Sequence, residues 1–177
     1  LLSAILGFCA FLSYVFIYTP MKRVSPWAVL VGAFPGAIPP MLGAIAHTNK
    51  FGLEPGVLFF VQFVWQFPHF WALAWMLHDD YAKAGFSLLP SKKGKDKTSL
   101  FLILMYSLIL IPVVLLPWAF GWTGMLTLIL GSVLGMVFYI ISYQFYRSPS
   151  DEYAKRLMFA SVIFLPVMQI IYVIDKV

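Results

Sequence analysis

The sequence predicts an all-α integral membrane protein with six transmembrane helices. Of its 177 residues, 62% are hydrophobic and only 11% are charged, whereas a soluble domain usually carries about 25% charged residues. A soluble core could not bury this much apolar surface, so lipid is the expected solvent. Crossing about 30 Å of hydrocarbon takes roughly 20 apolar residues. Six apolar runs come close to that length, at residues 1–18, 27–46, 55–77, 98–118, 122–145 and 157–174.

The chain is expected to form a single transmembrane domain, residues 1–177. Its longest polar stretch, at about residues 78–97, is too short to be a domain and predicts an ordered cap or a mobile lid at one end of the bundle. The chain does not begin with Met, and its first residue already lies in an apolar run. We therefore expect an N-terminal part to be missing. The single cysteine, Cys9, cannot form an internal disulfide.

Basic residues are concentrated on one side of the predicted bundle. If successive loops alternate between the two sides, the first side holds the loops at residues 20–26, 78–97 and 146–156. That side carries ten of the twelve Lys and Arg residues, and the other carries only Lys50 and Lys176. By the positive-inside rule, the first side faces the cytoplasm. Four lysines crowd its longest loop, either as topology markers alone or to bind anionic lipid headgroups or a phosphorylated substrate: Lys92, Lys93, Lys95 and Lys97.

Proline residues interrupt four of the apolar runs. A proline at membrane depth frees backbone carbonyls, which protein or water must then satisfy. The interrupted helices are therefore expected to enclose a cavity, although kinks that only serve packing are an equal alternative. The second run also carries small residues at helical spacing, which suit either close helix packing or an isoprenoid lying against the backbone: Gly32, Gly36, Pro40 and Gly43.

The third run carries a polar stripe. Gln62, Gln66 and His69 are spaced i, i+4 and i+7, so they share one face of a helix that continues to Asp80. Polar groups at membrane depth are costly unless they face a bundle interior or a cavity. The stripe is therefore expected to face the bundle interior or a cavity. For His69 the alternatives are a core histidine bonded to a neighbouring helix, a haem-propionate contact, proton transfer or axial iron ligation.

The stripe ends in an acidic pair, Asp79 and Asp80. Mg²⁺ typically binds one or two carboxylates and completes its shell with water and phosphate oxygens. Lys22, Arg23 and Lys83 lie on the same predicted side and could hold the remaining phosphate charge. An acidic pair at a helix end is also often only solvated. The pair alone therefore leaves a metal site and a solvated helix end both open.

Several stretches resemble the haem O synthase branch of the UbiA-type intramembrane prenyltransferases. The similarity runs in order from Tyr18 to Pro90, and beyond Pro90 it is mainly one of hydropathy. The Trp-Gln-x-Pro-His segment is specific to the haem branch. The matching stretches are Tyr18-Thr-Pro-Met-Lys-Arg23, Gly36-Ala-Ile-Pro-Pro-Met-Leu-Gly43, Trp65-Gln-Phe-Pro-His-Phe-Trp-Ala-Leu-Ala74, Asp79-Asp-Tyr-Ala-Lys-Ala-Gly85 and Leu89-Pro90.

The resemblance implies a nine-helix bundle of which this chain is the C-terminal part. It implies transfer of the farnesyl group of farnesyl diphosphate to a vinyl group of haem B, with water adding and diphosphate leaving. Two acidic motifs would hold Mg²⁺ and the diphosphate, and the first would lie upstream of this chain. His69 stands where other relatives have an acidic residue, which favours haem as the acceptor and leaves the number of metal ions open.

The resemblance also implies roles for individual residues. Asp80 and Asp79 would act in catalysis as metal ligands, together with His69. Lys22, Arg23 and Lys83 would bind diphosphate. The haem and isoprenoid cavity would include four further side chains, with Phe70 and Trp71 as additional aromatic walls: Gln62, Trp65, Gln66 and Tyr81.

The implied setting is the plasma (inner) membrane of a bacterium, with the active site facing the cytoplasm. Membrane lipid is an expected partner, haem A synthase or a second copy of the chain are alternative further partners, and nucleic acid is not expected. Three alternatives remain. One is a UbiA-type enzyme with an aromatic or quinone acceptor. Another is a transporter, which would need polar groups along its whole depth. The third is a non-catalytic assembly subunit of a respiratory oxidase.

Overall fold

The computed structural model describes residues 1–25, 27–91 and 93–177, and in these ranges every element is helical. Six helical segments are long and apolar enough to cross a membrane, which confirms the six predicted spans. The first combines α1 (Leu2–Ser13), a π-helical turn η1 (Tyr14–Tyr18) and α2 (Thr19–Met21). The others are α3 (Ala28–Thr48), α4 (Leu53–Met76), α6 (Lys97–Val114) with the short α7 (Leu116–Ala119), α8 (Met125–Arg147) and α9 (Asp151–Ile174).

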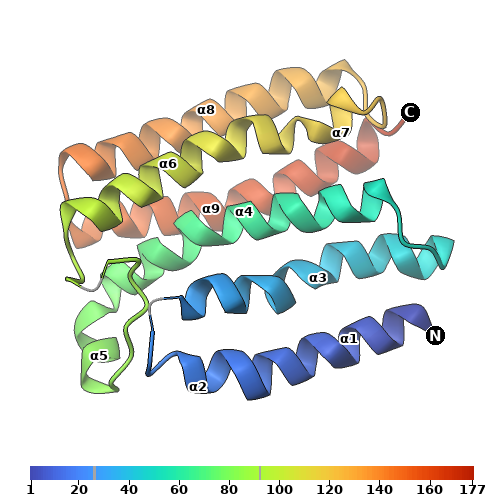
Figure 1. Ribbon diagram of the computed structural model, residues 1–177. Helices are drawn as coiled ribbons and strands as arrows, with labels where there is room; N and C mark the ends of the chain where they lie inside the picture. The colour runs from blue at the N-terminus through green and yellow to red at the C-terminus, as the bar shows by residue number, and fades with distance from the viewer. Residues whose placement is uncertain (26, 92) are drawn as a thin grey trace.

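Helix α4 is the centre of the bundle. It packs against α3, α6 and α9, and α8 completes a four-helix ring by packing against α6 and α9 (Figure 1). The first span lies outside this ring and packs against α3. Association of helices in lipid depends on close van der Waals packing. Helix α4 supplies it with four large buried side chains, Trp65, Phe67, Trp71 and Trp75.

The loops gather at two opposite ends of the bundle, as the alternation of charge predicts. At the basic end, the Ser87 N–H donates to the Lys22 carbonyl at 3.3 Å, and Lys95 pairs with Asp151 at 2.7 Å. These contacts join the three loops assigned to the basic side. At the other end, Lys176 pairs with Glu54 at 3.0 Å. The structure therefore places the predicted groups of loops together, apart from Lys92, which lies outside the described residues.

The last span begins earlier than its hydropathy predicts. The sequence places its start at residue 157, but α9 begins at Asp151. The Ser150 side chain accepts a hydrogen bond from the Tyr153 N–H and so caps the helix. Asp151 and Glu152 occupy its first turn, where carboxylates interact favourably with the positive end of the helix dipole. Capping and charge therefore extend α9 into the aqueous layer.

The polar stretch predicted as a cap folds into the short helix α5 (His78–Lys83) and a hydrogen-bonded turn before α6. Asp96 caps α6 by accepting from the Ser99 N–H at 2.8 Å and from the Ser91 hydroxyl at 2.7 Å. The Ser99 hydroxyl donates to the carbonyl of Gly94, whose φ of +77° suits glycine. Side-chain bonds therefore order the described part of this cap.

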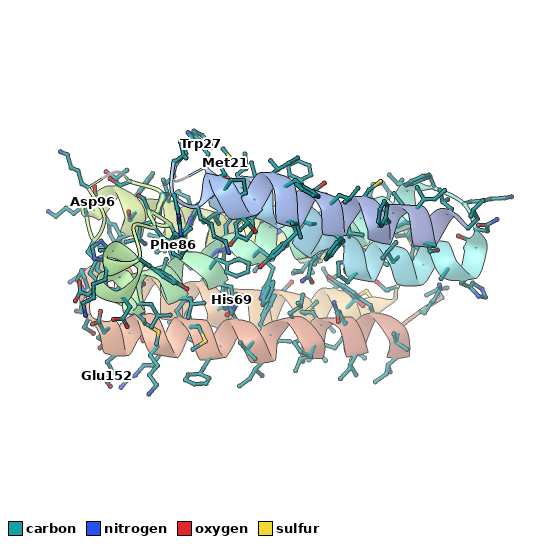
Figure 2. The ribbon with its side chains drawn as sticks, turned by 90° about the horizontal axis from the view of Figure 1, so that it is seen from below. Met21, Trp27, His69, Phe86, Asp96 and Glu152 are labelled. Atoms are coloured by element: carbon teal, nitrogen blue, oxygen red, sulfur yellow. The ribbon has the colours of Figure 1, made fainter. Side chains whose placement is uncertain are left out.

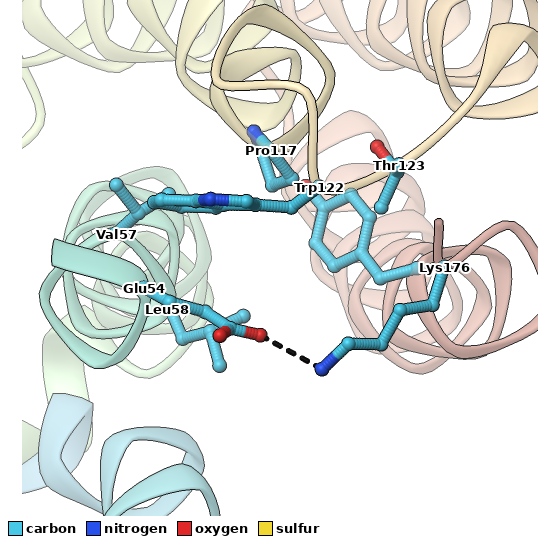
Figure 3. A pocket seen from close by; sticks show the side chains of 8 residues that line it. Glu54, Val57, Leu58, Pro117, Trp122, Thr123 and Lys176 are labelled. Carbon is cyan, nitrogen blue, oxygen red and sulfur yellow. Dashed lines mark hydrogen bonds and ion pairs between the residues drawn. The ribbon is translucent and has the colours of Figure 1, made fainter. Parts of the chain in front are cut away.

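A small pocket lies at the opposite end, between α4 and the C-terminal segment (Figure 3). Its volume of about 40 Å³ suits a water molecule rather than a substrate. Trp122 and the Glu54–Lys176 pair line it, and the buried Thr123 hydroxyl beside them has no hydrogen-bond partner among the described residues. The Glu54–Lys176 pair beside this pocket joins the C-terminal segment to α4. The pocket itself is too small for a substrate.

Candidate active site at the basic end of the bundle

A cavity of about 100 Å³ lies where the first span meets α3, α4 and α5. Lys22 and Tyr81 line it together with apolar and aromatic side chains. The Lys22 ammonium lies 4.2 Å from the centroid of the Tyr18 ring, a cation–π geometry. This cavity holds a cation within aromatic walls, which suits an anionic group carried on an apolar chain. Its other lining residues are Val29, Phe70, Leu73, Phe86 and Leu88.

Backbone hydrogen bonds bring these walls together. The Phe86 N–H donates to the Tyr81 carbonyl at 2.8 Å and so turns the chain back after α5. Gly85, with a φ of +73°, allows that turn. The Ser87 N–H then reaches the Lys22 carbonyl. Residues from two distant stretches of the sequence thus surround one cavity.

A second cavity, of about 270 Å³, adjoins the first and opens among the cap residues. Tyr81, Phe86 and Leu88 line both cavities, and His78 and Lys93 add polar groups to the second. Partial burial raises the pKa of the Tyr81 phenol above its ordinary value, so the hydroxyl stays neutral near pH 7. Tyr81 can therefore donate or accept a hydrogen bond where the two cavities meet.

The acidic pair occupies the first turn of α5 and faces water. The side chains of Asp79 and Asp80 are 88% and 74% exposed. Asp80 lies 3.5 Å from Lys83, and Asp79 lies 3.4 Å from the His78 ring. Within the described ranges, no group of three or more His, Cys, Asp or Glu side chains converges on one point. The pair thus offers two carboxylates, a number that suits Mg²⁺ completed by phosphate oxygens.

The three cations predicted to bind diphosphate have different surroundings. Lys22 lines the aromatic cavity, whereas Lys83 is 80% exposed and paired with Asp80. Arg23 is exposed beside Lys22. Of the three, only Lys22 lines this cavity, and Arg23 and Lys83 are exposed at the same end of the bundle. Lys93, one of the four lysines of the basic loop, lines the second cavity.

Gln66 is buried between α4 and α3. Its amide nitrogen donates to the Ala33 carbonyl at 3.2 Å and to the Gln62 carbonyl at 3.2 Å. Gly36 on α3 leaves the space that the Gln66 amide oxygen occupies. Gln66 therefore joins two helices, and its role toward a substrate stays a prediction. The buried oxygen of the Gln62 side chain has no partner among the described residues.

His69 turns toward α9 rather than toward α3. Its Nδ1 lies 2.7 Å from the Ser161 hydroxyl oxygen. The Trp65 indole N–H donates to the Ser161 carbonyl at 2.9 Å, and the Trp65 and His69 rings stack at 4.8 Å. The polar stripe is thus divided between two helix contacts. Phe70, the residue after His69, and Leu73, one turn further along the helix, line the cavity that holds Lys22.

A third cavity, of about 280 Å³, is lined by apolar and aromatic residues of α3, α4 and α6. Trp71 lines this cavity and Phe70 lines the smaller one, so the two predicted aromatic walls serve different cavities. Tyr106 packs edge to face against Trp71 with ring centroids 5.1 Å apart. Val29 borders both this cavity and the Lys22 cavity.

Sequence reasoning missed Ser161, Tyr18 and Phe86. Ser161 is fully buried in an apolar span, and a small polar residue at mid-span is a signal that would have found it. Tyr18 and Phe86 border two matching stretches, but only the fold of the cap shows that they share a cavity.

The fold and the site define an integral membrane protein whose charged groups and aromatic cavities meet at one end of a helical bundle. This arrangement suits an anionic, chain-bearing ligand. The comparison with known families agrees, because the sequence model of the UbiA prenyltransferase family matches residues 1–165. The chain therefore belongs to the UbiA prenyltransferase family.

Curated relatives of high similarity carry one name, protoheme IX farnesyltransferase. The protein from Cytophaga hutchinsonii is 47% identical over 175 residues, which cover 99% of this chain and 61% of the relative. The protein from Christiangramia forsetii is 48% identical, covering 98% of this chain and 59% of the relative. The Flavobacterium psychrophilum protein is 44% identical with the same coverages. The chain thus spans about three fifths of the length of these relatives. No solved structure matches it.

Proposed function

We propose that the full-length protein transfers the farnesyl group of farnesyl diphosphate to a vinyl group of haem B, giving haem O and diphosphate. The observation that carries this proposal is the Lys22–Tyr81 cavity, whose aromatic walls lie next to the acidic helix α5. The relatives named protoheme IX farnesyltransferase support the choice of haem as the acceptor.

The diphosphate would bind at the basic end. Lys22 offers a cation inside the cavity, Lys93 lines the adjoining cavity, and Arg23 and Lys83 are exposed at the same end of the bundle. Asp79 and Asp80 would hold Mg²⁺ against the phosphate oxygens, where the ion neutralises charge on the leaving diphosphate. Fixed cations at this point stabilise negative charge as the carbon–oxygen bond breaks.

The farnesyl chain would extend from this end into the apolar part of the bundle. Phe70, Leu73 and Phe86 line the cavity beside Lys22 and keep bulk water away from the allylic carbon. Aromatic faces such as that of Tyr18 also interact favourably with a developing cation. The walls therefore favour transfer of the farnesyl group over its hydrolysis.

The site would face the cytoplasm of a bacterium. Ten of the twelve Lys and Arg residues belong to the loops at this end, which supports that orientation through the positive-inside rule. Farnesyl diphosphate would then reach the site from the aqueous side, and haem B from the membrane.

Membranes containing the full-length protein provide the test. They are supplied with haem B, farnesyl diphosphate and Mg²⁺, and the pigments are separated and weighed by mass spectrometry. We expect haem O, formed only when the divalent ion is present. A parallel reaction offers a hydroxylated aromatic acid in place of haem. Prenylation of that acid and not of haem would support the alternative aromatic acceptor, and no prenylated product from either would contradict the proposal.

A further inference from the structure

The proposed reaction, on which this inference rests, leaves a proton to be removed. The carbon–oxygen bond of farnesyl diphosphate breaks, and its electron pair leaves with diphosphate. The outer vinyl carbon of haem bonds to the farnesyl carbon, which leaves a cation on the inner vinyl carbon. The oxygen of water then bonds to that carbon. The added water must lose one proton to become the hydroxyl group of haem O, and a base near this carbon would favour this addition by taking that proton.

The contacts of Ser161 fix which nitrogen of His69 is available. The Ser161 hydroxyl donates its single proton to the Met158 carbonyl on its own helix. Its oxygen can then only accept from the His69 Nδ1, 2.7 Å away. The proton of the neutral imidazole therefore sits on Nδ1, and Nε2 is left with a lone pair. Among the described residues, Nε2 has no hydrogen-bond partner.

The surroundings of His69 also hold its ring in place. The Trp65 ring lies nearly parallel to it, with an interplanar angle of 13°, and Phe70 meets it edge to face at 5.2 Å. Trp65 itself is bonded to the Ser161 carbonyl. Two contacts to one residue of α9 thus set the orientation of the imidazole.

The position of His69 suits the carbon that takes up water. Its neighbour Phe70 lines the cavity that holds Lys22. His69 lies seven residues before the end of α4 at Met76, which at 1.5 Å per residue is about 10 Å below the acidic end. Figure 2 shows it on the side of α4 between α9 and the first span. A carbon bonded to the farnesyl group would lie at about this depth, below the diphosphate.

We propose that His69 is the base that takes the proton from the adding water, through Nε2, and that Ser161 is the positioning residue that keeps Nε2 unprotonated. A neutral imidazole is well suited to general base catalysis. Gln66, on the α3 side of the same helix, has no such role because its amide is bonded to backbone carbonyls.

The test measures which product the haem cation gives, the one formed by adding water or the one formed by losing a proton. It does not measure how fast the cation forms. Without a base that assists water, loss of a proton from the farnesyl side of the cation, which gives an alkene, competes more strongly with the addition of water. That product is farnesylated haem lighter by one water. Both products form from the same cation on the same enzyme molecule. The ratio of hydroxylated to dehydrated product therefore does not depend on how much folded protein is present.

In full-length protein we expect His69→Gln to lower this ratio roughly 100-fold, in line with the usual contribution of a general base. Ser161→Ala should lower the ratio too, by less than His69→Gln does, because the imidazole is still present but no longer held in one tautomer. Ser161→Cys, which fills the same space with a poor acceptor, is the second variant if the alanine protein does not accumulate. Ser107→Ala is the matched control, because Ser107 is equally buried and bonds only to its own helix.

An unchanged ratio in His69→Gln would overturn the inference while leaving farnesyl transfer intact. A folded His69→Gln protein that makes neither product would also overturn it, because His69 would then act before water adds. If the parent protein itself makes no farnesylated haem, the proposed function fails instead.

Discussion

Gly36 on α3 and Gln66 on α4 fit together at the centre of the helix pair. Because Gly36 has no β-carbon, the Gln66 amide can lie against the α3 backbone and donate to the Ala33 carbonyl. A β-carbon at Gly36 would overlap the amide oxygen of Gln66. Gly36 of the small-residue stripe and Gln66 of the polar stripe thus form one contact.

Gly36→Ala should therefore destabilise the protein. The added methyl group must displace the Gln66 amide or separate the helices, and overpacking of this kind costs about 1–3 kcal/mol. Thermal unfolding in detergent measures the loss. Gly43→Ala on the same helix is the control, since a β-carbon there meets nothing within 4 Å. Equal stability of the two variants would contradict the packing role of Gly36.

Asp96 should make the stability of the cap depend on pH. Desolvation opposes its ionised form, but hydrogen bonds from Ser91 and Ser99 outweigh this and hold the pKa of Asp96 below its ordinary value. Since the folded pKa is the lower one, the stabilisation is complete above the ordinary carboxyl pKa of about 4. It is lost as the pH falls through the folded value.

Hydrogen exchange of residues 91–99 at a series of pH values measures this effect. Protection should decline on acidification in the parent protein and change less in Asp96→Asn, which cannot titrate. Ser91→Ala removes one of the bonds that lower the pKa and should shift the decline to higher pH. A parent protein and an asparagine variant with the same pH profile would refute the assignment.

The six spans could be predicted from composition, because residues exposed to lipid must be apolar over a fixed length. The start of α9 could not be predicted from hydropathy, because Ser150 caps the helix and Asp151 begins it ahead of the apolar run. The residues of the site were only partly predictable. Spacing placed Gln66 and His69 on one face of a helix, yet each bonds to a different neighbour. The partner of each side chain depends on how helices distant in sequence pack together. A local sequence pattern does not carry that information.

The orientation in the membrane can be tested with single cysteines in a Cys9→Ser background, which removes the native thiol of this chain. A cysteine replacing Lys93 should react with an impermeant thiol reagent only from the cytoplasmic side. One replacing Lys50 should react from the other side. Lys50 is preferred to Asn49, whose φ of 51° is unfavourable for cysteine. The opposite labelling pattern would move the proposed site to the outer face.

Asp80→Asn should abolish haem O formation while leaving the fold intact. The side chain faces water, and its one close charged contact is the exposed Lys83, so its loss should change stability by less than about 0.5 kcal/mol. Pigment analysis and thermal unfolding are measured on the same preparation. Glu152→Gln is the matched control, because it removes an exposed carboxylate from the same end of the bundle, on α9. Activity near the parent level in Asp80→Asn would mean that the acidic pair is only solvated.

Lys22 should act on farnesyl diphosphate rather than on haem. Its ammonium lies over the Tyr18 ring inside the aromatic cavity, so Lys22→Met removes the charge and keeps most of the apolar stem. We expect the apparent KM for farnesyl diphosphate to rise by about tenfold, as for the loss of one charged hydrogen bond of about 1.5 kcal/mol. A fall in kcat instead would mean that the contact strengthens in the transition state.

Lys155→Met is the control for Lys22, because Lys155 is exposed at the same end and its ammonium also lies near an aromatic ring, that of Phe159, at 6.0 Å. It should leave both Michaelis constants unchanged. The decisive comparison is between the two substrates within Lys22→Met. If the KM for haem rose and that for farnesyl diphosphate did not, Lys22 would bind the haem propionates. The diphosphate would then have to be held by the other cations at this end of the bundle.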